Sequence, residues 1–93
     1  MDKSEAQSVL DQQLALFTRR SYAELVAMID RPQVTQAKGP SGAAYNIEFN
    51  IFYDDSHRKQ DLRIMGSIDD GSGRSFMLPV TKSEIMKPTG ELA

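Results

Sequence analysis

The sequence predicts an α+β fold, with two N-terminal helices packed on one face of a four-stranded antiparallel meander sheet. The first observation is a regular alternation from Tyr45 to Tyr53, in which apolar and polar side chains take turns. Successive side chains of a strand point to opposite faces, so this run indicates a sheet that is buried on one side only. The second observation is a helical period of apolar residues before Pro32. All 93 residues are expected to form a single domain, 1–93.

Helices are predicted over about residues 4–30. Two capping boxes have the required spacing, Ser4 with Gln7 and Ser21 with Glu24. An apolar stripe at helical period follows the first box: Ala6, Val9, Leu10, Leu14, Leu16 and Phe17. Arg20 would fall inside this stripe if the helix continued, and the next apolar stripe is rotated away from it. We therefore expect a break near Arg19 to Ser21 and an end before Pro32.

Strands are predicted over about residues 33–81, separated by turns rich in glycine, aspartate and serine. The expected strands are a weak edge strand at Gln33–Lys38, then Ala44–Asp54, Asp61–Asp69, and Arg74–Thr81 with Pro79 near its end. If the inward positions of the two central strands meet, Phe49 lies opposite Gly66 and Ile51 opposite Ile64. Residues 82–93 are expected to form a terminal hairpin or to fray.

Composition and charge exclude several functional classes. A net charge of −2 provides no field to attract nucleic acid or an anionic membrane. The basic pairs Arg19-Arg20 and Arg58-Lys59 are not interleaved with aromatic residues, so they are interpreted as solvated charge. There is no cysteine, no apolar run approaches about 18 residues, and the N-terminus is too polar to begin a secretory signal. A cytoplasmic protein without nucleic-acid or membrane partners is expected.

No catalytic, metal or cofactor-binding residue can be assigned. His57 is the only histidine, and a structural zinc site needs about four good ligands. Aspartates gather at strand ends around Asp55 and Asp69, where they are interpreted as turn formers. No phosphate-binding loop or strained serine turn is present. The sequence therefore favours a protein that is not an enzyme.

The uncovered face of the sheet is the candidate interaction surface. The expected register places eight residues on this face: Asn46, Glu48, Asn50, Phe52, Arg63, Met65, Ser67 and Met77. Apolar side chains on a face without a covering layer suggest a partner, although single exposed apolar residues are common. A homodimer or a protein partner, bound through sheet faces or edge strands, is the simplest form.

Four segments together resemble a family of small uncharacterised bacterial proteins in which helices precede an antiparallel sheet. The segments are Ser21-Tyr22-Ala23-Glu24-Leu25, Gly39-Pro40-Ser41-Gly42, Phe52-Tyr53-Asp54-Asp55 and Asp61-Leu62-Arg63-Ile64-Met65-Gly66-Ser67-Ile68-Asp69-Asp70-Gly71. The resemblance implies the same fold. It implies no activity and no functional residue.

Two functional hypotheses remain. The first is a non-enzymatic cytoplasmic interaction or accessory module. The alternative is a small-molecule-binding protein or enzyme with a pocket between helices and sheet, in which Tyr22, Tyr45 and Tyr53 would supply hydroxyl groups.

Overall fold

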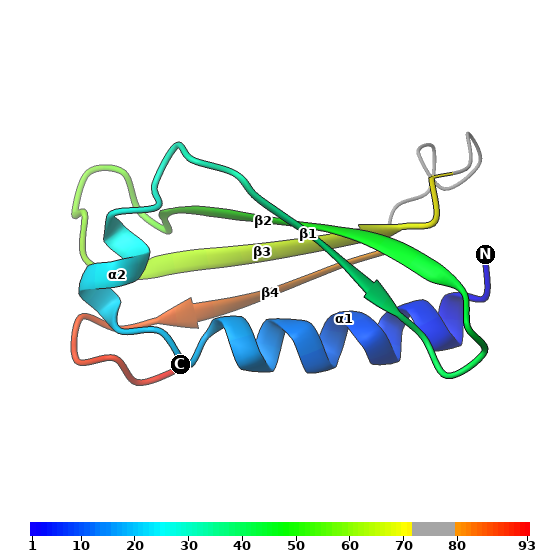
Figure 1. The fold of residues 1–93 in the computed structure, drawn as a ribbon. Helices are drawn as coiled ribbons and strands as arrows, with labels where there is room; N and C mark the ends of the chain where they lie inside the picture. Colours follow the sequence, from blue (N-terminus) through cyan, green and yellow to red (C-terminus); the bar gives the residue numbers. More distant parts are fainter. Residues whose placement is uncertain (72–79) are drawn as a thin grey trace.

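The chain forms an antiparallel sheet with one long and one short helix before it (Figure 1). This computed structural model describes residues 1–71 and 80–93. In these ranges the elements are α1 (Lys3–Phe17), α2 (Tyr22–Val26), β1 (Gln33–Lys38), β2 (Ala44–Tyr53), β3 (Leu62–Asp69) and β4 (Val80–Met86). The strands lie in the order β1-β2-β3-β4, and each pairs antiparallel with the next. The predicted α+β meander is confirmed.

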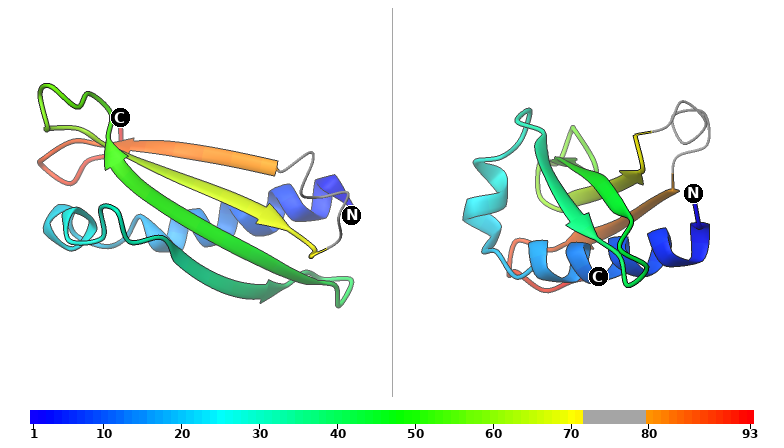
Figure 2. Two further views of the ribbon diagram at one scale, coloured as in Figure 1. Left: turned by 90° about the horizontal axis from the view of Figure 1, so that it is seen from above. Right: turned by 45° about the vertical axis from the view of Figure 1, so that its right-hand side comes forward.

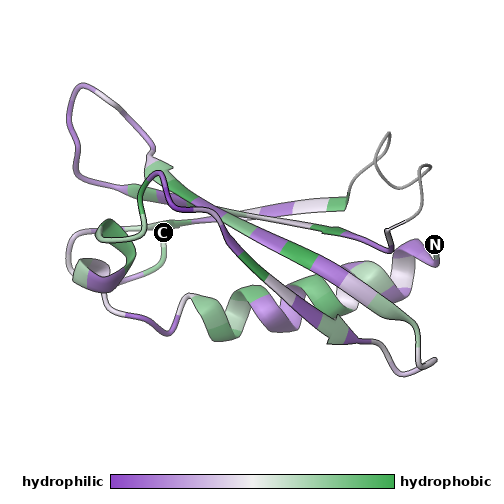
Figure 3. Ribbon diagram, turned by 45° about the horizontal axis from the view of Figure 1, so that its top comes forward, coloured by the Kyte–Doolittle hydropathy of each residue, from purple (hydrophilic) through white to green (hydrophobic). Residues whose placement is uncertain are grey.

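Strand β2 has the alternation that its sequence predicts, visible as alternating colours in Figure 3. Tyr45, Ile47, Phe49 and Ile51 are buried, whereas the polar residues between them are partly exposed. Cα partners across β2 and β3 include Phe49 with Gly66 and Ile51 with Ile64. The predicted register is therefore correct.

The predicted break between the helices is also confirmed. Helix α1 ends at Phe17, and Ser21 begins α2 with a complete capping box, in which its side chain accepts from the Glu24 amide at 3.1 Å. Helix α2 ends at Val26 rather than near residue 30, because the chain continues in tighter hydrogen-bonded turns up to Arg31. The second helix is thus a short one.

The predicted N-terminal capping box at Ser4 is wrong. Asp2 is the N-cap, and its Oδ1 accepts from the Glu5 amide at 3.1 Å. Asp2 has the same capping chemistry as Ser4 and lies earlier in the chain, so the helix begins before Ser4. As a result, the Glu5 side chain lies in the first turn of the helix and can reach the sheet.

Helix α1 covers only part of the sheet. It packs on β3 and β4, and α2 contacts β2 at the end of the sheet where β3 begins. Seen from above, β1 and β4 lie at opposite edges (Figure 2). The buried core contains residues of α1, α2 and the strands: Ala6, Val9, Leu10, Leu14, Phe17, Leu25, Tyr45, Ile47, Phe49, Ile51, Leu62, Ile64, Ile68 and Met86.

Leu16 does not join the core as predicted, because 54% of it is exposed. It lies at the margin of the apolar stripe, and no strand in the described residues covers that side of α1. Thr35 of β1 faces the same layer as Phe49 and is exposed as well. Both observations show that the interior side of β1 is only partly covered near α1.

Strand β4 extends beyond the predicted end of the last strand at Thr81. The predicted start at Arg74 lies outside the described residues, as do Met77 and Pro79. The polar run Lys82-Ser83-Glu84 gave no strand signal, but pairing with β3 continues as far as Met86 opposite Leu62. Beyond it, Met86 forms a bridge with Leu92, and the Ala93 amide donates to the Ile85 carbonyl at 2.8 Å.

We expect Gly66→Ala to destabilise the protein by roughly 1–2 kcal/mol. A Cβ atom at position 66 would lie 2.9 Å from Leu10 Cδ1 and 3.1 Å from Phe49 Cε1, so the Leu10 side chain or the Phe49 ring would have to shift. Urea unfolding measures the change. Ser67→Ala, on the opposite face of the same strand, is the control and should change stability by less than about 0.5 kcal/mol. Equal stability of the two variants would contradict the close packing at Gly66.

Candidate functional site

The structure brings together the described members of the predicted interaction face. Cα partners on this face are Asn46 with Asp69, Glu48 with Ser67, Asn50 with Met65, and Phe52 with Arg63. Met77 lies outside the described residues. Phe52 and Met65 are 38% and 36% exposed. This face therefore presents two moderately exposed apolar side chains among polar ones.

Most polar groups on this face bind one another. Arg63 Nη2 lies 2.8 Å from Asp54 Oδ1, and Arg63 Nη1 donates to Ser83 Oγ at 3.0 Å. Asn50 Nδ2 donates to Glu48 Oε1 at 3.2 Å. Such neighbouring pairs stabilise the surface of a sheet. Their donors and acceptors are partly occupied within the chain.

Two of the tyrosine hydroxyls proposed as pocket groups bind the protein. Tyr22 donates to the Gln60 carbonyl, and Tyr45 donates to Glu5 Oε1 at 2.6 Å, so both join separate elements of the fold. None of the three tyrosines lines the groove between α1 and β1.

Glu5, Ser41 and Tyr45 form a hydrogen-bonded cluster, the Glu5 cluster, that joins α1 to the β1–β2 turn. The Ser41 amide donates to Glu5 Oε2 at 2.9 Å, and Ser41 Oγ donates to Oε1 at 2.7 Å. The carboxylate lies so close to Gly39 that a Cβ there would be 2.5 Å from Glu5 Cδ. The Tyr45 and Ser41 hydrogen bonds lower the pKa of Glu5, and the Glu5 hydrogen bond raises the pKa of Tyr45 to about 12.

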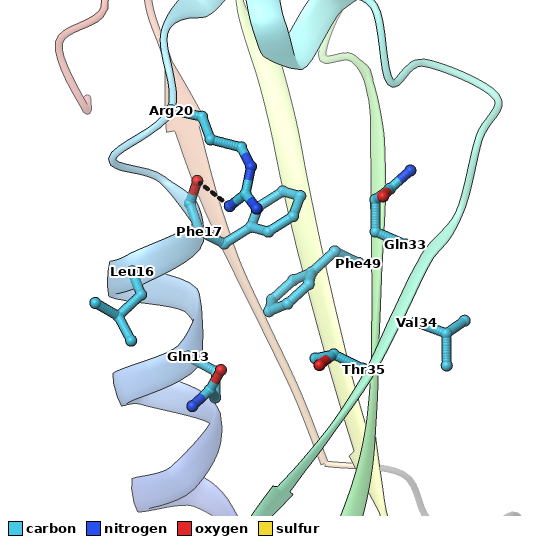
Figure 4. Close-up of a pocket in the computed structure, with 8 residues that line it drawn as sticks. All are labelled: Gln13, Leu16, Phe17, Arg20, Gln33, Val34, Thr35 and Phe49. Carbon is cyan, nitrogen blue, oxygen red and sulfur yellow. Dashed lines mark hydrogen bonds between the residues drawn. The ribbon is translucent and has the colours of Figure 1, made fainter.

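A groove opens between the C-terminal half of α1 and β1, further along the helix than the Glu5 cluster. We call it the β1 groove (Figure 4); its volume is about 300 Å³. Eight residues line it: Gln13, Leu16, Phe17, Arg20, Gln33, Val34, Thr35 and Phe49. Leu16 is 54% exposed on the helix side of the groove. Val34 is 71% exposed, and its side chain points away from the groove, to the opposite face of the sheet (Figure 4). Among the described residues, the lining contains one cation, Arg20, and no carboxylate.

Two stacked rings form the inner surface of the β1 groove. The rings of Phe17 and Phe49 have centroids 4.2 Å apart and planes that differ by 17°. The Arg20 guanidinium carbon lies 4.4 Å from the Phe17 centroid, and Arg20 Nη1 donates to the Phe17 carbonyl at 3.4 Å. Arg20 is exposed, as a solvated charge would be, and its guanidinium also lies over an aromatic ring.

The outer edge of β1 offers backbone hydrogen-bonding groups beside this groove. The Gly39 amide donates to the Ala43 carbonyl at 2.9 Å, which identifies Gly39 and Ala43 as a hydrogen-bonded pair. Such pairs alternate along antiparallel strands, so Val34, Gln36 and Lys38 direct their amide and carbonyl groups away from β2. In residues 1–71 and 80–93, no strand pairs with this edge.

The two edges of the sheet differ. On β4, the C-terminal segment bonds the Ile85 carbonyl and bridges Met86. On β1, Val34 to Ala37 contain no charge and no proline, which are the usual protections of an exposed edge, and Lys38 at the end of the strand is its one charged residue. Strand β1 is therefore suited to accept another strand.

Part of this site was accessible to sequence reasoning. The weak strand at Gln33–Lys38 was correctly predicted as an edge. The unusual position of Arg20 could be seen in the sequence, because this charged residue falls inside the apolar stripe if the helix is extended. Leu16 gave a misleading signal, since helical periodicity cannot tell which side of a stripe the sheet leaves uncovered.

The acidic loop after β2 is a turn. The Asp55 side chain accepts from the His57 amide at 2.9 Å, and Asp69 accepts from the Gly71 amide at 2.8 Å. These bonds confirm that both aspartates shape turns. Within the described ranges, no group of three or more histidine, aspartate or glutamate side chains could hold a metal ion.

Comparisons with family models, curated proteins and solved structures found no match to this chain. In the part of the chain that the structure describes, no helix is long and apolar enough to cross a membrane.

We expect Tyr45→Phe to raise the pKa of Glu5, because the variant removes the largest cause of its lowering. A pKa below the ordinary 4.5 means that the Glu5 carboxylate stabilises the fold above about pH 4.5, and that this stability is lost as the pH falls through the lower, folded-state value. The stability difference between wild type and variant should therefore shrink in acid. NMR titration of the Glu5 side chain and urea unfolding at several pH values measure both effects.

Tyr22→Phe is the matched control, since its hydroxyl bonds Gln60 and not Glu5. An unchanged Glu5 titration in Tyr45→Phe would contradict the Glu5 cluster.

Proposed function

We propose that this protein is a non-enzymatic interaction module that binds an extended segment of a partner polypeptide along β1. The observation that supports this most directly is the outer edge of β1, without charge from Val34 to Ala37, beside a groove with polar and aromatic walls. An added strand obtains affinity from main-chain hydrogen bonds and specificity from pockets that receive alternate side chains. Both features are present at this edge.

The backbone geometry fits one added strand. Val34, Gln36 and Lys38 each present an amide and a carbonyl at the outer edge of β1. A strand placed there would lie about 4.8 Å from β1. Every second side chain of that strand would face the layer that contains α1, beside Thr35 and the β1 groove.

The groove favours binding over catalysis. Its lining offers amide, hydroxyl, apolar and aromatic groups and a guanidinium, but no histidine, carboxylate or thiol that could act as acid, base or nucleophile. Its volume of about 300 Å³ lies at the lower limit for small-molecule sites, and it is open at the side of β1. A single side chain of a bound segment fits this space better than a large cofactor.

The predicted sheet face is a weaker candidate. Arg63 is occupied by Asp54 and Ser83, and the apolar members Phe52 and Met65 are less exposed than Leu16 beside the β1 groove. Val34 of β1 faces the same side as these residues, because its Cα partner is Glu48. The proposal therefore retains the predicted class of protein and moves the contact from the open face to the edge.

Selection from a displayed library of random short peptides on the immobilised protein tests the proposal. We expect enriched peptides whose binding falls at least about tenfold in Gln36→Pro, because proline removes an outward amide without breaking the bonds to β2. Thr81→Pro is the matched control. Thr81 occupies the equivalent outward position on β4, so this variant should retain binding.

Failure to enrich any peptide, or equal binding by wild type and Gln36→Pro, would contradict the proposal. Sedimentation tests whether a second copy of this chain occupies the edge instead. If no peptide is enriched and the wild type is a dimer that dissociates in Gln36→Pro, the occupant of the edge is a second copy of this chain and not a partner segment.

A further inference from the structure

We infer that the segment bound at β1 has a carboxylate that pairs with Arg20, two residues from an apolar side chain that enters the β1 groove. This inference rests on the proposed function and specifies the chemistry of the partner. It follows from the charge of the groove, the position of Arg20 and the spacing of side chains on a strand.

The groove has an uncompensated positive charge. Among the described residues, Arg20 is the one cation in its lining, and no acidic side chain lines it. None of the ion pairs in these residues involves Arg20. Within residues 1–71 and 80–93, its one hydrogen bond is the 3.4 Å contact from Nη1 to the Phe17 carbonyl, near the upper limit of distance. The other guanidinium N–H groups can therefore bind a ligand.

The guanidinium is also held in place. Its carbon lies 4.4 Å from the centre of the Phe17 ring, in the range of a cation–π contact. Stacking of this kind orients the planar fork of donors, so less freedom is lost when a carboxylate binds it. Arg19 is the next residue in the chain, but it lies outside the groove, against the exposed surface that Gln12, Ala15 and Leu16 line.

The apolar requirement comes from the helix side and inner surface of the groove. The stacked rings of Phe17 and Phe49 lie between α1 and β1 (Figure 4), and Leu16 stands beside them on the helix. An apolar side chain placed here would pack against these rings and cover part of Leu16. Gln13, Gln33 and Thr35 leave polar groups available for the backbone of the bound segment.

Strand geometry links the two requirements. Side chains two residues apart on a strand point to the same face, about 6.6–7 Å from each other. Figure 4 shows Arg20 at the end of the groove nearest Gln33, with Gln13 and Thr35 at the other end. One inward side chain can thus enter the groove while the next inward side chain meets Arg20.

Binding of a selected peptide and its Glu→Gln or Asp→Asn analogue, to wild type and to Arg20→Gln, tests this inference. We expect the amide analogue to bind wild type about fivefold more weakly, and Arg20→Gln to bind the acidic peptide more weakly by a similar factor. In Arg20→Gln the acidic and amide peptides should bind equally, because the two changes remove the same ion pair. Arg20→Lys should restore part of the preference for the acid.

Arg19→Gln is the matched control, because it removes an equal charge one residue away and should keep the full preference for the acid. The peptide comparison on wild type does not depend on how well any variant folds. Apolar peptides enriched with no acidic residue, or an acid preference that persists in Arg20→Gln, would overturn this inference while the proposed function stands. A library from which nothing is enriched would overturn both.

Discussion

The close contact of α1 with β3 at Gly66 determines how the rest of the molecule is arranged. The absent side chain leaves room for Leu10 of the helix and the Phe49 ring of β2. Strands lie about 4.8 Å apart, so the outer strands of this sheet are separated by roughly 14 Å, whereas a helix with side chains is about 10 Å wide. One helix cannot cover four strands equally. Packed on β3 and β4, α1 leaves the interior side of β1 only partly covered.

The contacts near the two ends of α1 then have different consequences. Near its N-terminus, the Glu5 carboxylate accepts hydrogen bonds from Ser41 and Tyr45 and holds the helix to the β1–β2 turn. Further along the helix no such bond joins it to β1 in the described residues, and the β1 groove lies there. Phe17 and Phe49 close the core beneath this groove by stacking on each other. The N-terminal end of α1 is thus bonded to the β1–β2 turn, whereas its C-terminal half leaves the β1 groove open.

Sequence patterns predicted the features that depend on local periodicity. The alternation from Tyr45 to Tyr53 indicated the buried face, and placing inward positions together gave the correct pairing of Phe49 with Gly66. The break between the helices followed from two differently oriented stripes. The first cap was misplaced, since Asp2 and Ser4 both have capping side chains and pattern alone cannot rank them. No periodic pattern in the sequence indicates over which strands α1 lies. The exposure of Leu16 and the groove beside Arg20 depend on that position, so they could be found only in the structure.

The central claim is that α1 covers the β3–β4 half of the sheet and leaves the β1 edge free, and amide hydrogen exchange along β1 tests it most directly. The account predicts alternation, with slow exchange at Thr35 and Ala37, whose amides face β2, and fast exchange at Val34 and Gln36, whose amides face outward. Equally slow exchange at all four positions in the isolated monomer would show that another segment covers this edge, and would contradict the account.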